Sequence, residues 1–272
     1  MLINPFGGQG NAKRLFEKRA RPVLEAANCV LDVQTTEYHG HGVDIARELD
    51  ITAHDAVICC SGDGVPSEVF NGLAKRPDAL EALGRIAVCQ LPCGSGNAMC
   101  WNLTGTDDVA AASLAIVKAM RKPLDLVSIT QGDRRSLSFL SQSVGIIAEV
   151  DLGTEDLRWM GGFRFTVGLL QRLWKQAVYP CELAVKVALD DKEAIRDHYR
   201  HGHLRHQGDD TDKPAQHTGD GLPPLRFGTI NSPLPKDWEL VPHPNMGNFY
   251  AGNVSPSLRN SLHRHWHLLT LL

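Results

Sequence analysis

Three glycine-rich segments, at residues 4–10, 61–64 and 94–97, each follow a short apolar run. Backbone can approach a phosphate closely where no Cβ intervenes, and a helix that follows such a loop supplies unpaired N–H groups. One such loop is typical of an ordinary tight turn, but three at successive strand–helix junctions predict a phosphate site. None matches GxxxxGK[ST] or GxGxxG, which disfavours a P-loop enzyme and a Rossmann dehydrogenase.

Asp63 lies between Gly62 and Gly64 in the second of these segments. A carboxylate repels phosphate, so its presence there predicts a different task. It can accept a proton from an attacking hydroxyl, or hold magnesium beside a nucleotide. The alternative is an aspartate that stabilises a turn. The motif alone leaves these interpretations open.

Alternating strands and helices position the three segments within residues 1–122. Continuous apolar runs predict buried strands, and amphipathic stretches with acids first and bases last predict helices. The expected strands are residues 1–3, 30–35, 56–60 and 86–91, and the expected helices are 11–27 (divided at Pro22), 43–49, one that begins near Pro66, and 107–122. This order predicts a doubly wound, mainly parallel sheet.

From Leu124 the pattern changes to the alternation that is typical of antiparallel strands. We expect strands at residues 124–130, 136–147, 182–189, 225–230, 238–241 and 249–252, and a helix at 155–174. Residues 190–224 are polar and rich in His, Asp and Gly, which predicts a disordered insertion. The expected architecture is an α/β lobe over residues 1–122, followed by a mostly antiparallel, incomplete β-sandwich over 123–253.

Composition excludes several classes. The chain has 272 residues, with 28 Lys and Arg against 31 Asp and Glu, and a net charge of −3 disfavours a nucleic-acid partner. Seven cysteines without a CxxC pair predict reduced thiols rather than disulfides or a zinc site. No apolar run reaches the roughly 18 residues of a membrane span, and no signal peptide is recognisable. We therefore expect a cytoplasmic protein that contacts membranes peripherally.

Several blocks together resemble the diacylglycerol-kinase-like catalytic domain. They are residues 4–8 (NPFGG), 61–64 (SGDG), 68–73 (EVFNGL) and 91–98 (LPCGSGNA). SGDG in place of GGDG, and the block at 139–173, are similar to sphingosine (sphingoid long-chain base) kinases. The resemblance covers about residues 1–253 apart from the insertion. It implies ATP-dependent phosphorylation of the primary hydroxyl of sphingosine, sphinganine or phytosphingosine, with ATP and Mg²⁺ as cofactors and unknown metal ligands.

The resemblance also implies roles for individual residues. Asp63 matches the general base, and Asp151 matches the acid that holds the polar head of the lipid. The positions that match the ATP site are Asn4, Pro5, Phe6, Thr36, Ser61, Gly62, Gly64, Glu68, Gly94, Ser95, Gly96, Arg158 and Arg164. Without the resemblance, the two arginines are solvated helix residues and Asp151 belongs to an acidic helix N-terminus.

The chain departs from the family pattern at both ends. Only three residues precede Asn4, and the pattern is lost after residue 253, so residues 254–272 are interpreted as a non-family tail of an altered or truncated chain. The alternatives are a diacylglycerol or ceramide kinase, an NAD kinase, which shares GDG, and an inactive fragment that only binds nucleotide or lipid. Asp151 discriminates among the lipids, because neutral diacylglycerol has no ammonium for it to hold. The oligomeric state stays open.

Overall fold

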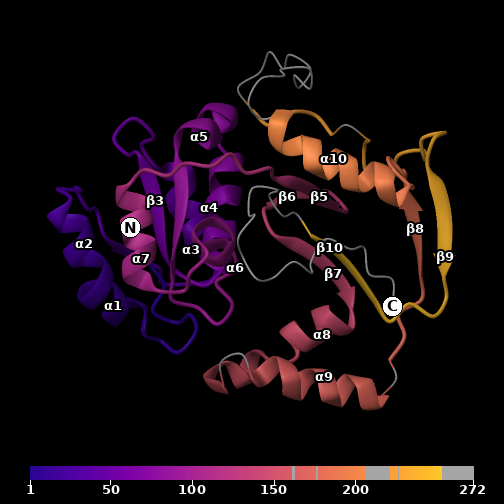
Figure 1. The fold of residues 1–272 in the computed structure, drawn as a ribbon, viewed down its shortest axis with the longest axis horizontal. Helices are drawn as coiled ribbons and strands as arrows, with labels where there is room; N and C mark the ends of the chain where they lie inside the picture. Colours follow the sequence, from indigo (N-terminus) through magenta and orange to yellow (C-terminus); the bar gives the residue numbers. More distant parts are fainter. Residues whose placement is uncertain (161–162, 176, 206–220, 226, 253–272) are drawn as a thin grey trace.

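A computed structural model describes residues 1–160, 163–175, 177–205, 221–225 and 227–252. Figure 1 shows an α/β lobe that contains the N-terminus, and a second part in which short antiparallel strands lie beside α8, α9 and α10. The predicted tail and residues 206–220 of the predicted insertion lie outside the described residues. The helices among the described residues are too short or too polar to cross a membrane.

One parallel sheet forms the centre of the α/β lobe. Its strands are β1 (Leu2–Ile3), β2 (Gln34–Thr35), β3 (Ala56–Ser61) and β4 (Ala87–Pro92), in the order β2-β1-β3-β4. Leu2 pairs with both Gln34 and Cys59, so β1 lies between β2 and β3. The predicted parallel sheet is confirmed, although β2 covers only the end of the expected strand at 30–35.

Helices cover both faces of this sheet. They are α1 (Ala12–Leu15), the π-helical η1 (Phe16–Ala20), α2 (Arg21–Ala26), α3 (His41–Glu48), α4 (Gly64–Ala74), α5 (Ala79–Arg85), α6 (Ala98–Thr104) and α7 (Val109–Val117). On one face, Phe16 and Leu24 pack with Cys60 of β3. On the other, Val69 and Leu73 pack with its neighbour Cys59. Successive β3 side chains thus enter opposite cores, which is the doubly wound arrangement that was predicted.

The second part of the chain contains three separate two-stranded antiparallel sheets among the described residues. They pair β5 (Val127–Gln131) with β6 (Arg134–Ser138), β7 (Ser141–Gly145) with β10 (Asn248–Gly252), and β8 (Cys181–Val185) with β9 (Glu239–His243). The helices are α8 (Ile146–Leu152), the 3₁₀-helical η2 (Glu155–Met160), α9 (Phe163–Lys175) and α10 (Lys192–Arg205). Antiparallel pairing is confirmed, as three separate ladders.

Three expectations for this part are wrong. Of the strand expected at 225–230, the described residues 225 and 227–230 form no strand. The strand expected to reach residue 147 ends at Gly145, whose φ of 102° favours glycine, and helix α8 follows. Asp151 therefore lies in the last turn of a helix rather than after a strand. In place of the disorder expected at 190–224, residues 192–205 form α10. Asp191 caps this helix by accepting a hydrogen bond from Ala194 N at 2.7 Å.

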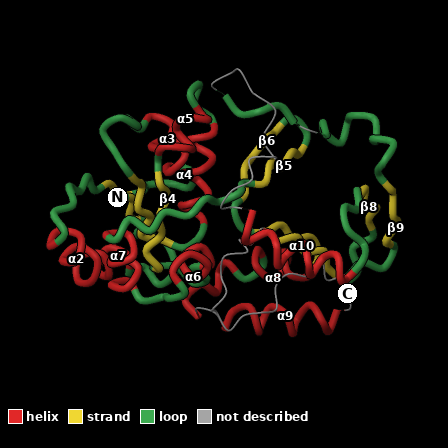
Figure 2. The backbone as a smooth tube through the Cα atoms, turned by 45° about the horizontal axis from the view of Figure 1, so that its top comes forward, coloured by secondary structure: helices red, strands yellow, loops and turns green. Residues whose placement is uncertain are grey.

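A polar and aromatic contact joins the α/β lobe to the antiparallel part. Asn71 of α4 accepts a hydrogen bond from Leu137 N and donates one to Leu137 O, both at 2.8 Å. Beside it, the rings of Phe70 and Phe139 lie 5.5 Å apart. Figure 2 shows β5 and β6 next to α4 on this side of the molecule. The helix that follows the SGDG loop is thus bonded directly to β6. The domain boundary at residue 122 stays a prediction.

Candidate functional site

The three glycine loops leave the same edge of the sheet. They follow β1, β3 and β4, which are parallel neighbours. A Cβ built on Gly94 would lie 2.2 Å from Gly62 Cα, and one built on Gly8 would lie 2.8 Å from the Cys93 carbonyl oxygen. Real Cβ atoms do not approach so closely, so only glycine allows the loops to touch. The structure therefore brings the three loops together.

The first loop is shaped by Asn4. Its backbone N–H donates to Cys60 O at 3.1 Å, and its side-chain oxygen accepts a hydrogen bond from Phe6 N at 2.9 Å. The loop turns sharply at Pro5 as a result, and the Phe6 side chain is 71% exposed. Asn4 thus orients the turn through its own side chain, as asparagine commonly does.

Both carboxylate oxygens of Asp63 are held by the start of α6. Ala98 N donates to Oδ2 and Met99 N donates to Oδ1, each at 2.9 Å. Gln90 of β4 adds a longer contact from its side-chain nitrogen at 3.4 Å. Each carboxylate oxygen has two lone pairs, and Oδ2 accepts only the Ala98 N–H, so one acceptor position on Oδ2 is still open to a further donor. Asp63 therefore joins the second loop to the third and can also accept a hydroxyl proton.

Sequence reasoning missed two residues that organise these loops. Asn97 accepts from Gly94 N at 2.8 Å and donates to Gly94 O at 2.9 Å, with a left-handed φ of 53°. Gln90 accepts from Cys100 N at 2.7 Å. The available signals were an Asn immediately after a glycine turn and a lone polar residue in an apolar strand. Ser61 is fully buried and donates to Gly62 O.

Thr36 and Glu68 hold the loop between β2 and α3. Thr36 is buried, and its N–H donates to Ile3 O at 2.9 Å. Glu68 reaches across from α4, and its two oxygens accept hydrogen bonds from Gly40 N and Gly42 N, each at 3.0 Å. Glu68 thus contacts the loop that begins at Thr36, one of the positions that match the ATP site.

Asp151 and Arg164, which were expected to bind different ligands, bind each other. An Arg164 nitrogen lies 2.7 Å from Asp151 Oδ1, and the guanidinium also donates to Asp151 O and Thr154 Oγ1 at 3.2 Å. The Arg164 residue is 6% exposed, whereas the Asp151 side chain is 61% exposed. Among the described residues, neither forms a hydrogen bond or ion pair with the glycine loops. The side chain of Arg158 lies outside the described residues.

All seven cysteines are unpaired thiols. Burial raises the pKa of the Cys59 thiol. Cys60 and Cys93 share a hydrogen bond at the base of the second and third loops, which raises the pKa of Cys60 and lowers the pKa of Cys93. Burial raises the pKa of Cys89 to about 11. Four of the seven, Cys59, Cys60, Cys93 and Cys100, are buried, in agreement with the predicted burial, whereas the reduced state stays a prediction.

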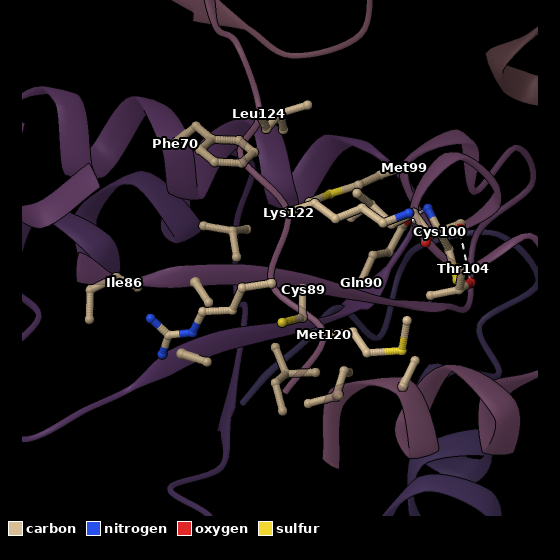
Figure 3. A pocket seen from close by; sticks show the side chains of 18 of the residues that line it. Phe70, Ile86, Cys89, Gln90, Met99, Cys100, Thr104, Met120, Lys122 and Leu124 are labelled. Carbon is tan, nitrogen blue, oxygen red and sulfur yellow. Dashed lines mark hydrogen bonds between the residues drawn. The ribbon is translucent and has the colours of Figure 1, made fainter. Parts of the chain in front are cut away.

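A large open cavity lies along β4 and reaches the third loop. Its volume is about 2310 Å³, and Gly96 and Ala98 contribute to its wall. Figure 3 shows Phe70, Met99 and Leu124 lining it on one side and Met120 on another. Further along the chain, its lining residues include Leu140 between β6 and β7, Ile147 of α8, Phe165 of α9 and Tyr250 of β10. The cavity is mostly apolar, and part of its wall adjoins the glycine loops.

Comparison with known proteins shows which proteins this chain is similar to. The diacylglycerol kinase catalytic domain matches residues 1–129. Sphingoid long chain base kinase 5 of Saccharomyces cerevisiae is 44% identical over 203 residues, which are 73% of this chain and 30% of that protein. The chain is sphingosine kinase-like. Sphingoid long chain base kinase 4 of Schizosaccharomyces pombe is 38% identical over 199 residues, or 73% of this chain and 43% of the relative.

Human sphingosine kinase 1 is 36% identical to this sphingosine kinase-like chain over 194 residues, which are 68% of the chain and 50% of the human protein. The chain thus spans between 30% and 50% of the length of these three relatives. A solved structure named for a diacylglycerol kinase of Bacillus anthracis has a TM-score of 0.51 at 22% identity, and covers 69% of this chain and 60% of that one. That likeness supports the diacylglycerol-kinase-like fold.

The glycine loops fit a nucleotide better than the described residues fit a resident metal. Around Gly64, at the first turn of α4, no atom lies within 4 Å of a built Cβ, so the backbone there is open to a ligand. Among the described residues, no three His, Cys, Asp or Glu side chains are grouped as a metal site would require. In kinases generally, magnesium bound to a nucleotide is held largely by phosphate oxygens.

Proposed function

We propose that this chain is an ATP-dependent lipid kinase that phosphorylates the primary hydroxyl of a sphingoid base (sphingosine, sphinganine or phytosphingosine) to the 1-phosphate. The observation that carries the proposal is the convergence of three glycine loops at one sheet edge, with Asp63 in the middle loop. The names of the relatives support the substrate class. Because the chain spans at most half of those relatives, its activity is itself part of the proposal.

The nucleotide binds over the glycine loops. ATP supplies the phosphoryl group, with Mg²⁺ on its phosphates. Backbone N–H groups at the open start of α4, next to Gly64, and in the loop of Gly94, Ser95 and Gly96 donate to phosphate oxygens. The helix dipole of α4, which has eleven residues, favours negative charge at the same place.

Asp63 orients the attacking hydroxyl and accepts its proton. Its carboxylate is fixed by the Ala98 and Met99 N–H groups, so it does not need to be ordered when the substrate binds. One lone pair on Oδ2 is still available for the hydroxyl. The same contacts mean that Asp63 also holds α6 in place.

The Asp151 carboxylate accepts a hydrogen bond from the ammonium group of the sphingoid base. Its side chain is 61% exposed, so the carboxylate has an accessible face besides the one that Arg164 occupies. A charged hydrogen bond is about twice as strong as a neutral one, which favours a cationic amino alcohol over diacylglycerol.

The hydrocarbon chain and the membrane contact the apolar surfaces of the second part. The cavity beside the third loop exceeds the roughly 300–1,000 Å³ of a usual small-molecule pocket, so it has room for a lipid chain. Nearby, α8 and α9 carry exposed apolar side chains, namely Leu152, Phe163, Leu170 and Trp174. An exposed apolar patch of this kind is typical of a peripheral membrane contact.

Transfer of labelled γ-phosphate from ATP to sphinganine in detergent micelles tests the proposal. We expect turnover with sphinganine, much less with diacylglycerol or ceramide, and loss of turnover in Asp63→Asn. Asparagine can accept a hydrogen bond from only one of the two N–H groups that donate to Asp63, so the variant can disturb the loops. ATP binding is therefore measured by calorimetry beside the assay. Lost turnover with retained ATP binding supports the role of Asp63 in the reaction.

Two results would contradict the proposal. If the wild-type chain binds ATP but shows no turnover, it is a nucleotide-binding protein and not a kinase. Faster turnover of diacylglycerol than of sphinganine assigns the chain to the neutral-lipid kinases.

A further inference from the structure

We infer that Glu68 is a positioning residue that holds the loop between β2 and α3 ready for the nucleotide, and that it is not itself a nucleotide ligand. The inference rests on the proposed function, because it concerns how the same ATP site is built. It assigns to Glu68 a role different from the direct contact that the family resemblance implies.

The Glu68 carboxylate binds the loop between β2 and α3 through both of its oxygens. Oε1 accepts a hydrogen bond from Gly40 N and Oε2 accepts one from Gly42 N, both at 3.0 Å. These two N–H groups lie at the start of α3, where a helix has no partners of its own for its first amides. Both carboxylate oxygens are therefore engaged with this loop.

The Glu68 side chain packs closely against Gly42. A Cβ built on Gly42 would lie 2.8 Å from Glu68 Oε2 and 3.1 Å from Glu68 Cβ. Gly40 has a φ of 91°, which favours glycine. The loop and the carboxylate thus fit each other only because both positions are glycine.

Glu68 connects helix α4 to the loop that follows β2. It lies on α4, the helix that begins immediately after Asp63, whereas Gly40 and Gly42 follow β2 at the far side of the sheet. Asp63 makes the equivalent contact to the N–H groups that begin α6. One helix therefore fixes the loops on both of its sides through two carboxylates.

Other contacts also hold the same loop, and none involves Glu68. The ring of Tyr38 stacks on that of His41 with centroids 4.5 Å apart, and Tyr38 Oη donates to Asp44 at 2.9 Å. Glu37 N donates to His41 Nδ1 at 3.1 Å. Loss of Glu68 should therefore loosen the loop locally without unfolding the lobe.

Glu68→Gln tests the inference in two measurements on the full chain. The glutamine amide oxygen can accept a hydrogen bond from one of the two N–H groups. The amide nitrogen is a donor, so it cannot accept a hydrogen bond from the other N–H group. In nucleotide-free protein, we expect exchange of the Gly40 and Gly42 amides to become about tenfold faster. Calorimetry should give an ATP affinity about tenfold weaker, with sphinganine binding unchanged.

Two further variants keep the test interpretable. Gly42→Ala pushes the Glu68 carboxylate away and should reproduce both effects while Glu68 stays present. Glu48→Gln makes the same chemical change on α3, at a side chain that is 75% exposed and pairs with Arg47. It should alter neither measurement.

The outcomes separate the inference from the proposed function. Weaker ATP binding by Glu68→Gln with unchanged amide exchange would mean that Glu68 touches the nucleotide, and would overturn the inference. Faster exchange with unchanged ATP affinity would overturn it too, because the loop would then play no part in binding. If the wild-type chain binds no ATP, the proposed function and the nucleotide part of the inference both fail, and amide exchange alone decides whether Glu68 holds the loop.

Discussion

The carboxyl edge of the parallel sheet and the α8–α9 helix pair are built in opposite ways. At the sheet edge, Gly62 and Gly94 are packed backbone against backbone, and the polar side chains between the loops are hydrogen-bonded. On α9, Leu170 is 63% exposed and Trp174 is 91% exposed. The first arrangement fixes loop positions, whereas the second leaves apolar area free. Under the proposed function, this difference separates a rigid site for a water-soluble nucleotide from an apolar surface for a lipid.

Gly94→Ala should produce the largest effect, because it attacks the rigid half of the comparison. Its Cβ would lie 2.2 Å from Gly62 Cα and 2.6 Å from Gly62 N, and backbone cannot move aside as a side-chain end can. We expect ATP affinity to fall by about a hundredfold and the free energy of unfolding to drop by about 1–3 kcal/mol, as in other overpacked sites. Calorimetry and urea unfolding measure the two quantities.

Gly84→Ala is the matched control for this change. Gly84 lies in α5, and nothing lies within 4 Å of its built Cβ. Alanine favours a helix over glycine, so stability should stay the same or rise slightly. Equal losses in the two variants would show that the close contact between Gly62 and Gly94 has no special importance.

Asp151→Asn should give the next largest effect, on the lipid side. Loss of a charged hydrogen bond typically costs about 1.5–3 kcal/mol, so the KM for sphinganine should rise at least about tenfold while the KM for ATP changes little. Thermal stability should fall as well, because Arg164 is 6% exposed and loses its carboxylate partner.

Arg172→Met separates lipid binding from the stability of the helix pair. Among the described side chains, Arg172 forms a second ion pair between α8 and α9, with Glu149 at 2.8 Å. The Arg172→Met variant should have a lower thermal stability than the wild type, without a higher KM for sphinganine. If both variants raise that KM equally, Asp151 acts only by holding α8 against α9.

Leu170→Ser with Trp174→Ser tests the apolar half of the comparison. Transfer of exposed apolar side chains out of water is favourable, so their loss should weaken binding to anionic lipid vesicles by about fivefold. ATP binding should not change. Leu114→Ser, at a side chain that is 47% exposed on α7, serves as the control. Equal weakening by the control would show that vesicle binding is not located on α9.

Asp78→Asn should have the smallest effect, and one that depends on pH. Hydrogen bonds from Arg76, at 2.7 Å and 2.9 Å, lower the pKa of the Asp78 carboxyl. A carboxyl with a lowered pKa in the folded state stabilises the fold above its unfolded pKa, and that contribution is lost as pH falls through the folded value. Wild type should therefore unfold at a higher temperature than the variant at pH 7, with the difference shrinking below about pH 4. A constant difference across this range would contradict the assignment.

The sheet and its loops could be predicted because their signals are local. Residues 56–60 are apolar throughout and stop at SGDG, so both the buried strand β3 and the loop after it follow from short stretches of sequence. Adjacency of three such strands in a parallel sheet then brings the loops to one edge. The glycines at 8, 62 and 94 were predicted to approach a ligand, and the structure adds that they approach one another.

The remaining site features depend on contacts between distant residues. Glu68 binds N–H groups 28 and 26 positions earlier in the chain, and no local pattern marks such a pairing. Helix α8 contains Ile and Val, which favour strands, but Val150 packs against α9 at Gly168, where a Cβ would lie 3.0 Å away. Tertiary packing overrides propensity there. The pairing of Asp151 with Arg164 depends on that helix packing and was missed for the same reason.

Amide hydrogen exchange of the full chain with and without ATP and Mg²⁺ tests most directly whether the three loops form one nucleotide site. We expect protection by ATP at residues 4–10, 61–64 and 94–97 together, with none on α8 or α9. Protection limited to one loop, or located on the helix pair instead, would contradict it.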